Sequence, residues 1–222
     1  MLRSLRKFAD PTRLEGMARY GIDVRHALGV TMTELRGLAR TLPRDHGLAA
    51  ALWDSGIHEA RILATIVDDP ALVTEEQMER WVHDVGSWDL CDQACGNLFD
   101  KTPLAFDKAA EWTERPEEFV KRAGFALMAW AAVHRKDVPD ERFGAFFPLI
   151  LAQATDERPY VKKAVNWALR QIGKRSPELH RRAIATARRI GRLDSRAARW
   201  VAADALRELE SPAVLARLRN RA

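Results

Sequence analysis

A tryptophan and an aspartate stand four residues apart in the segment VGSWDLCDQACGNLF, which spans Val85–Phe99. In a helix this spacing places the Asp92 carboxylate beside the Trp88 indole. An apolar arc lies next to this pair, formed by Leu90, Cys91, Ala94, Cys95 and Leu98. Trp88 continues the arc and Asp92 stands at its margin. A carboxylate fixed there can stabilise positive charge on a substrate, while a helix-edge Asp paired with a neighbouring Arg is the alternative.

A second tryptophan lies in a helix expected at 158–173. The 3.6-residue period fills one face of this helix with Val161, Ala164, Val165, Ala168, Leu169 and Ile172. The opposite face carries Lys163, Trp167, Arg170 and Lys174. Cations interleaved with an indole suit phosphates that flank a group packed on the ring. A tryptophan at helical spacing more commonly packs in a core, and this interpretation stays open.

An arginine interrupts the otherwise apolar segment FVKRAGFALMAWAAV. The small residues Ala126 and Ala129 follow Arg122 one and two turns later, which leaves the guanidinium room to reach a phosphate. A salt bridge at the edge of the core is the alternative role for this side chain.

Positive charge is concentrated in the last part of the chain. Residues 161–222 contain 16 Lys and Arg against 5 Asp and Glu, whereas residues 1–160 contain 20 against 26. The basic part is a candidate footprint for a polyanion, although a solvated helical surface can also be rich in arginine.

Other chemistries have no support in the sequence. The segment HEARI at His58 lacks the second histidine of a zinc-protease motif, because residue 62 is Ile62. Walker loops, dinucleotide-binding glycine motifs and nucleophile elbows do not occur, so we expect neither metal nor cofactor. Cys91 and Cys95 are expected to be reduced core residues, because their spacing on one helix is poor for a disulfide.

The elements that must position these residues are helices, because 3.6-residue periodicity recurs and no long period-two alternation occurs. Proline and glycine signals separate them. The expected helices are 11–19, 31–41, 45–54, 57–68, 74–84, 87–98, 104–113, 116–135, 139–154, 158–173, 176–190, 195–209 and 211–220. The predicted class is all-α.

An internal repeat indicates how the helices stack. FVKRAGFAL and YVKKAVNWAL begin 41 residues apart, and WVAADAL begins 40 residues after the second, at Trp200. The third copy is weaker, because Trp200 is expected inside its helix rather than near the start. A period near 40 is typical of HEAT-like helix pairs, so we expect a helical-repeat solenoid with a concave basic surface. A generic helical bundle is the alternative.

Length and hydropathy predict a single soluble unit. No linker interrupts the 222 residues, so we expect one domain spanning 1–222. The longest apolar run, Ala123–Val133, is too short for a bilayer, and MLRSLRKFAD lacks the apolar region of a secretory signal. We expect a cytoplasmic monomer with no membrane partner.

The chemistry-bearing segments resemble the DNA alkylation repair glycosylases of the AlkD-like family, which are built from HEAT-like repeats. SWDLCDQAC matches the Trp-x-x-x-Asp motif, FVKRAGFAL the arginine segment and YVKKAVNWALRQ the second tryptophan segment, in the family's order. Weaker likeness runs from MARYGIDVRHALGV through LWDSGIHEARILA to DSRAARWVAADAL, and so covers nearly the whole chain.

The resemblance implies a role for each of these residues. Asp92 is implied to be the catalytic carboxylate, Trp88 and Trp167 to pack against the sugar-phosphate of the lesion nucleotide, and Arg122 to hold a backbone phosphate. The residues expected to bind DNA are Lys163, Arg170, Lys174 and Arg196. Ser87 stands where some relatives have a second aromatic residue, which concerns the substrate range more than the reaction.

This chemistry is consistent with one carboxylate. Breaking an N-glycosidic bond develops positive charge on the deoxyribose, which a fixed carboxylate stabilises. An N3- or N7-alkylated purine is already cationic and leaves without a second acid. We therefore expect a DNA glycosylase that acts on cationic alkylpurines in double-stranded DNA. A noncatalytic DNA-binding repeat protein and a protein-interaction scaffold are the alternatives.

Overall fold

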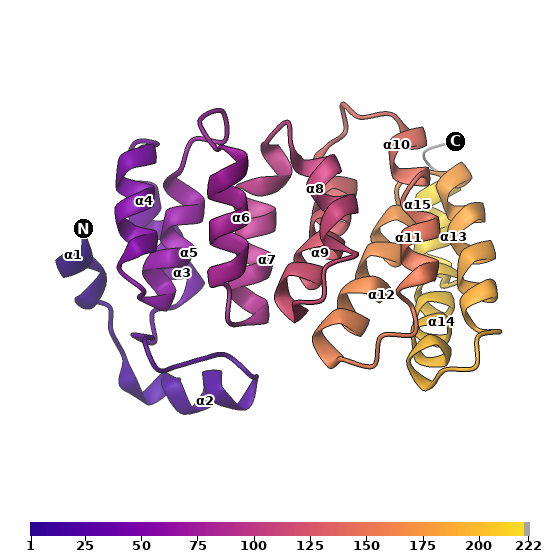
Figure 1. Cartoon of the computed structure of the whole chain (residues 1–222), viewed down its shortest axis with the longest axis horizontal. Coiled ribbons are helices and arrows are strands. Elements are labelled where there is room, and N and C mark those ends of the chain that lie inside the picture. The colour runs from indigo at the N-terminus through magenta and orange to yellow at the C-terminus, as the bar shows by residue number, and fades with distance from the viewer. Residues whose placement is uncertain (220–222) are drawn as a thin grey trace. The chain divides into compact units, whose positions relative to one another are not determined.

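The structure is a computed structural model that describes residues 1–219. Within this range it contains helices and no strands (Figure 1), so the predicted all-α class is confirmed. The chain divides into two compact units, Met1–Thr102 (unit 1) and Pro103–Ala222 (unit 2). The single domain expected from the sequence stays a prediction. None of the described helices is long and apolar enough to cross a membrane.

Unit 1 is built from short helices. They are α1 (Leu2–Arg6), α2 (Leu14–Arg19), α3 (Met32–Ala39), α4 (His46–Asp54), α5 (His58–Val67), α6 (Glu75–Asp84) and α7 (Trp88–Asn97). Short 3-10 helices occupy Pro11–Arg13 and Phe99–Lys101. Three starts are fixed by side-chain caps, since Thr31, Asp45 and Thr74 each accept a hydrogen bond from a first-turn amide. The helix α1 was not expected from the sequence.

The core of unit 1 is centred on α5, which packs against α3, α4 and α7. Nearly every residue of α5 is buried, including the polar residues His58 and Glu59. Two buried indoles also belong to this core: Trp53 and Trp81 are stacked with their ring centroids 4.0 Å apart. This packing fixes the start of α5 against the start of α7, where the Trp88 and Asp92 pair lies.

Unit 2 contains the longer helices. They are α8 (Ala105–Trp112), α9 (Glu118–His134), α10 (Asp140–Gly144), α11 (Phe147–Ala152), α12 (Pro159–Gly173), α13 (Pro177–Ile190), α14 (Arg196–Leu209) and α15 (Pro212–Arg219). Several begin with proline, whose missing N–H costs nothing in a first turn. The predicted helix 211–220 extends one residue beyond the described range.

Helix α12 is at the centre of unit 2, in contact with α9, α13 and α14. All six residues of its predicted core face, listed above, are fully buried, which confirms the helical projection. Helix α9 also packs closely on α8 at Gly124, where an added Cβ would lie 2.9 Å from the amide nitrogen of Thr113. Glycine is needed there because the two backbones approach so closely.

The single helix predicted at 139–154 is wrong, because the chain forms two short helices, α10 and α11, instead. Pro148 lies in the first turn of α11 and has no N–H to donate to the carbonyl of Gly144. That carbonyl accepts a hydrogen bond from Arg182 Nη2 at 2.8 Å instead. The apolar periodicity is continuous across the break, which is why it predicted one helix.

The repeat read from the sequence corresponds to a repeated position in the helices. Phe119 is the second residue of α9, and Tyr160 is the second residue of α12. Trp200 is instead the fifth residue of α14. The difference expected for the third copy is therefore confirmed. The fold is a HEAT-like helical repeat, while the basic concave surface stays a prediction.

Candidate functional site

The Trp88 and Asp92 pair lies at the margin of the buried face of α7. Both residues are half-buried, whereas the five apolar residues of the predicted arc are buried. Cys91 and Cys95 are buried and form no disulfide in the described part of the chain, as expected. The arrangement predicted for α7 is therefore confirmed: an indole and a carboxylate share one partly exposed edge of a helix.

The Trp88 indole has a fixed orientation. Its Nε1–H donates a hydrogen bond of 2.8 Å to the backbone carbonyl of Tyr20. Tyr20 is the C-cap residue of α2 and is followed by Gly21, whose φ of 75° turns the chain. The Tyr20 side chain itself is 75% exposed. An exposed aromatic beside the candidate site is a residue that the sequence interpretation missed, although it lies in the matched segment MARYGIDVRHALGV.

A buried ion pair lies under the first turn of α7. His58 Nε2 is 2.8 Å from Asp89 Oδ2, and the Ser87 hydroxyl donates to Asp89 Oδ1 at 2.7 Å. His58 is only 7% exposed. Burial alone would lower the pKa of His58 and raise that of Asp89. Because each group stabilises the charge of the other, the pKa of His58 is instead raised and that of Asp89 lowered.

This ion pair attaches the start of α7 to the start of α5. Asp89 lies directly between Trp88 and Leu90 in the first turn, so His58 restrains the turn that carries the indole. The sequence offered no signal for the pairing, because the two residues are 31 positions apart.

In unit 2, Arg122 is buried with a relative exposure of 5%. Its Nη1 donates a hydrogen bond of 2.8 Å to the carbonyl of Tyr160 at the start of α12. This contact fastens α12 to α9 near the segment that carries Trp167. The role of Arg122 as a phosphate ligand stays a prediction.

The Trp167 indole is half-buried and contacts another indole. Its ring centroid is 5.4 Å from that of Trp130, with the planes 81° apart, and Trp130 stacks on His134 at 4.9 Å. The edge-to-face contact holds Trp167 by its apolar surface. Trp130 is thus a positioning candidate that the sequence interpretation missed, and its place two turns after Arg122 on α9 was the available signal.

Two of the four cations predicted to bind DNA form ion pairs with an acidic side chain. Arg170 and Lys174 both pair with Glu208 on α14, and the Lys174 Nζ to Glu208 Oε1 distance is 2.5 Å. Burial raises the pKa of Glu208, but the two cations outweigh it and lower this pKa overall. Glu208 therefore stays ionised and balances part of the predicted positive stripe.

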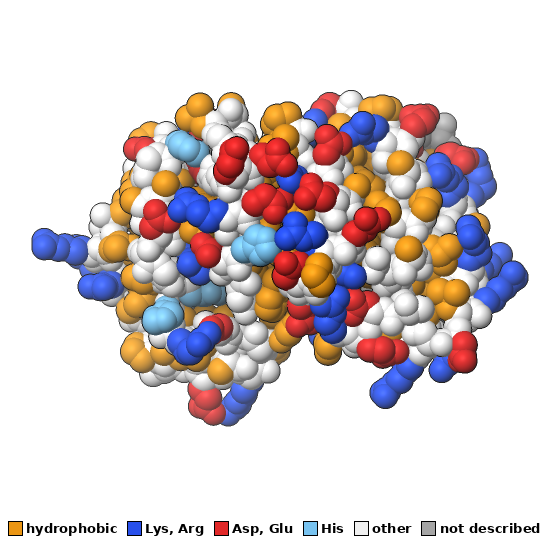
Figure 2. All heavy atoms as spheres, in the orientation of Figure 1, with side chains coloured by type: hydrophobic (Ala, Val, Ile, Leu, Met, Phe, Trp, Pro, Cys, Tyr) orange, Lys and Arg blue, Asp and Glu red, His pale blue; other side chains and the backbone are white. Residues whose placement is uncertain are grey.

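The other two predicted DNA contacts are available to a polyanion. Lys163 on α12 and Arg196 at the start of α14 are exposed, and in residues 1–219 neither forms an ion pair. Figure 2 also shows Lys and Arg side chains gathered over α13, while acidic side chains gather over the start of α6. The positive charge read from the sequence thus lies on the surface of unit 2.

The residues predicted to act chemically are distributed over both units. Trp88 and Asp92 belong to unit 1, and Arg122 and Trp167 belong to unit 2. Each indole is oriented by a neighbour from its own unit. The α7 edge can stabilise a cation through a carboxylate and an electron-rich ring, while the α12 surface offers an indole among cations.

Comparisons with known proteins place this geometry in a family. The family model of the DNA alkylation repair enzyme matches residues 1–209. A solved structure has a TM-score of 0.77 and 19% sequence identity, with 93% of each chain covered. It is described as a new family of proteins related to the HEAT-like repeat DNA glycosylases with affinity for branched DNA structures. No curated protein matches the chain. Since the family model covers nearly its whole length, the chain belongs to the DNA alkylation repair enzyme family.

Proposed function

We propose that this protein is a DNA glycosylase that hydrolyses the N-glycosidic bond of positively charged N3- and N7-alkylated purines in duplex DNA. The observation that carries the proposal is the pairing of Trp88 and Asp92 on a partly exposed edge of α7 in a member of the DNA alkylation repair enzyme family. A carboxylate and an indole are the groups that favour a cationic sugar.

Asp92 is the proposed catalytic residue. As the C1′–N bond breaks, its electron pair moves to the alkylated base, which leaves as a neutral molecule. Positive charge develops on the deoxyribose and is stabilised by the Asp92 carboxylate and the face of Trp88. Water then adds to C1′ and loses one proton to Asp92 or to the solvent.

Leaving-group chemistry sets the proposed substrate class. Glycoside hydrolases generally use a second carboxyl group to protonate the departing oxygen. A purine alkylated at N3 or N7 already carries the positive charge that protonation would supply. One aspartate therefore suffices for cationic lesions, and neutral lesions such as hypoxanthine are left in place.

Phosphate binding is proposed for the cations of unit 2. Lys163 and Arg196 are exposed and have no ion-pair partner in the described chain, so they are the stronger candidates. Arg170 and Lys174 are already paired with Glu208 and contribute less. Arg122 is proposed to hold a backbone phosphate.

DNA binding without base excision is the second candidate function. It is favoured by the structural neighbour, whose description gives affinity for branched DNA structures. A protein of this kind would bind a four-way junction more tightly than a linear duplex of the same length, and it would release no base from either.

The test is to incubate the purified chain with duplex DNA treated with a methylating agent, and to identify released bases by mass spectrometry. We expect release of 7-methylguanine and 3-methyladenine. Asp54→Asn is the matched control for Asp92→Asn, because Asp54 is an exposed carboxylate of unit 1 that pairs with Arg80. This control should release bases at the wild-type rate. Junction binding without any released base would replace the glycosylase proposal with the second candidate.

A further inference from the structure

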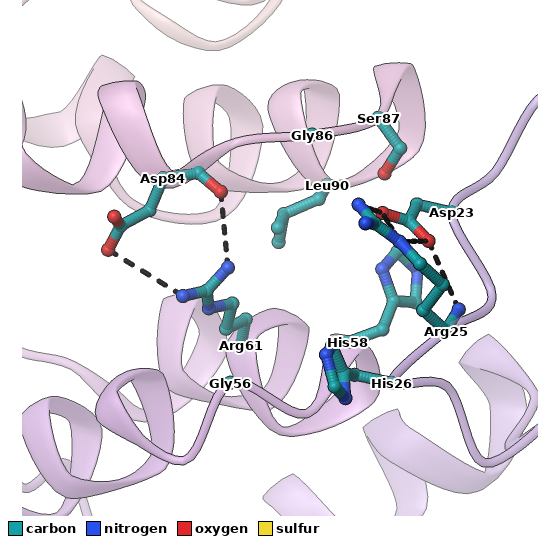
Figure 3. Close-up of a pocket in the computed structure, with 10 residues that line it drawn as sticks. All are labelled: Asp23, Arg25, His26, Gly56, His58, Arg61, Asp84, Gly86, Ser87 and Leu90. Carbon is teal, nitrogen blue, oxygen red and sulfur yellow. Dashed lines mark hydrogen bonds and ion pairs between the residues drawn. The ribbon is translucent and has the colours of Figure 1, made fainter.

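A cavity of about 190 Å³ lies in unit 1 where α6 ends and α7 begins (Figure 3). The starts of α5 and α7 and the loop before α3 form its walls. Leu90 lines the cavity, and Asp92 follows two residues later, roughly 200° around the helix axis. The cavity therefore opens on a different side of α7 from the proposed catalytic edge.

The first feature of this cavity is the N-terminus of α7. Ser87 is the N-cap residue, but its side chain makes no capping hydrogen bond, because the hydroxyl donates to Asp89 instead. Gly86 and Ser87 both line the cavity. The first turn also carries the Asp89 carboxylate, whose charge is balanced by His58, so the positive end of this ten-residue helix still favours an anion in the cavity.

The second feature is the imidazole of His58, a buried polar group on the cavity wall (Figure 3). The Asp89 carboxylate accepts a hydrogen bond from the Ser87 hydroxyl and a second from His58 Nε2, so Nε2 carries a proton. This leaves Nδ1 as the ring nitrogen that can serve a ligand. When His58 is protonated, Nδ1 is a charged donor.

The third feature is the guanidinium of Arg61 on the opposite wall (Figure 3). Its Nε donates to the carbonyl of Trp53 at 3.2 Å, and Nη1 donates to the carbonyl of Asp84 at 3.1 Å. The guanidinium also lies over the Trp53 ring, 5.3 Å from the centroid. These contacts fix the cation in place, so little side-chain entropy is lost when it binds a ligand.

The carboxylates near the cavity are already used by other donors. Asp23 accepts three hydrogen bonds from the Arg25 guanidinium, which lowers the pKa of this carboxyl to about 2. Asp84 accepts a hydrogen bond of 2.8 Å from Trp53 Nε1 and lies 3.7 Å from Arg61 Nη2. Both carboxylates therefore already have partners in unit 1.

The remaining titratable groups around His58 are Glu59 and His26. Glu59 is directed at the backbone and accepts hydrogen bonds from the amides of residues 28, 29 and 30. His26 lines the cavity on the side of Gly56. A helix N-terminus, an imidazole and a fixed guanidinium thus converge on one cavity from three elements.

We propose that this cavity binds a tetrahedral oxyanion of the phosphate class, held by Arg61, His58 and the N-terminal amides of α7. The ligand is a phosphate monoester or free phosphate ion, because His58 lies too deep for a phosphodiester in the middle of a duplex. The inference goes beyond base excision and does not depend on it, since the side chains of Arg61 and His58 do not belong to the proposed catalytic edge.

The test is calorimetric titration of the full chain with sulfate at constant ionic strength, at pH 6 and pH 9. Sulfate keeps the same charge over this range, whereas phosphate titrates. We expect saturable binding that weakens about tenfold between pH 6 and pH 9, because deprotonated His58 loses its charge. Arg61→Gln should weaken binding at pH 6 at least tenfold. Arg40→Gln is the matched control, because Arg40 is exposed in the same unit and is not one of the residues that line the cavity.

His58→Gln should bind sulfate weakly at both pH values, and Arg61→Gln tests the site independently if this variant fails to fold. The source of the phosphate is then distinguished with oligonucleotides that carry a 5′-phosphate or a 5′-hydroxyl. A preference for the 5′-phosphate that Arg61→Gln abolishes points to a strand end, and saturable phosphate binding without this preference points to a free phosphate ester. Absence of saturable sulfate and phosphate binding, or equal losses in Arg40→Gln and Arg61→Gln, would overturn the proposal. Neither result bears on Asp92 or on base release.

Discussion

The two candidate tryptophans, one in each unit, are held in different ways. Trp88 in unit 1 is oriented by one directional hydrogen bond from its indole N–H to the Tyr20 carbonyl. Trp167 in unit 2 is oriented by the edge of Trp130, an apolar contact that requires no N–H. The first arrangement fixes a ring beside a carboxylate, and the second places a ring among cations.

This difference separates chemistry from binding. A ring held by a hydrogen bond keeps one angle, which suits a group that must face a reacting atom. A ring held by apolar contact tolerates small shifts, which suits packing against a sugar-phosphate backbone. We therefore assign the rate of base release chiefly to the α7 edge and DNA affinity chiefly to the α12 surface, and the predictions below test that assignment.

The largest effect is expected at Asp92. Asp92→Asn is nearly isosteric and removes only the charge that stabilises the developing sugar cation. Loss of one such electrostatic partner costs on the order of 10²-fold or more in rate. Single-turnover release of 7-methylguanine should fall by this factor while the affinity for undamaged duplex stays at the wild-type value. Release of 7-methylguanine at the wild-type rate by a folded Asp92→Asn protein would show that Asp92 is not the catalytic residue.

The buried His58 and Asp89 pair should dominate the stability of the α7 start. A raised His58 pKa contributes stability that is fully present below the unfolded-state value near 6.5 and is lost as pH rises through the folded value. A lowered Asp89 pKa contributes stability above 3.8 that is lost as pH falls through its folded value. The pair therefore stabilises most between these limits.

His58→Gln keeps a hydrogen-bond donor for Asp89 but removes the charge. We expect it to reduce the free energy of unfolding by about 1–3 kcal/mol near pH 6, and by less at pH 9. Urea unfolding at the two pH values measures the difference. His46→Gln is a control, because His46 is more exposed and pairs with Asp68 away from α7. A pH-independent loss in His58→Gln would show that only packing was removed.

Conservative replacement of the two tryptophans tests the comparison directly. Trp88→Phe loses the hydrogen bond to Tyr20, worth about 0.5–1.5 kcal/mol, so the single-turnover rate should fall by up to about tenfold. Trp167→Phe keeps an aromatic edge contact with Trp130, so its rate should fall by less. Equal rate losses in the two variants would show that the mode of attachment does not matter.

The smallest effects are expected for single cations, and pairs of substitutions make them measurable. Replacing both Lys163 and Arg196 with Gln should reduce the slope of log affinity against log salt by about two units, because each exposed cation neutralises about one phosphate. Replacing Arg170 and Lys174 should change the slope less, since Glu208 already balances them. Glu208→Gln should raise duplex affinity. Equal slopes for the two double variants would show that pairing with Glu208 does not reduce the contribution of Arg170 and Lys174 to DNA binding.

Periodicity in the sequence predicted the faces of helices but not their partners. The six core residues of α12 and the apolar arc of α7 follow from a 3.6-residue period, because burial alone decides them. The contacts from Trp88 to Tyr20, from His58 to Asp89 and from Arg170 to Glu208 join residues 31 to 68 positions apart. Such pairings depend on how helices pack, which no local pattern contains.

The helix prediction from periodicity was also wrong where a single residue interrupts a long apolar segment. The apolar period continues through 139–154, yet Pro148 ends it as a single helix because it cannot donate its backbone hydrogen bond. Trp130 was hidden for the opposite reason, since it lies in an apolar run and looks like any core residue. Its role beside Trp167 is visible only from the ring geometry.

The most direct test of the account is a comparison of one cationic and one neutral lesion in otherwise identical duplexes. Single-turnover release of 7-methylguanine and hypoxanthine is measured at the same salt concentration with the wild-type chain. A site with one carboxylate supplies no proton to a neutral base, and general acid catalysis contributes about 10²–10⁴-fold where it exists. The account predicts release of 7-methylguanine at least about 10²-fold faster than hypoxanthine. Comparable rates for the two lesions would contradict it, because they require a general acid that Asp92 alone does not provide.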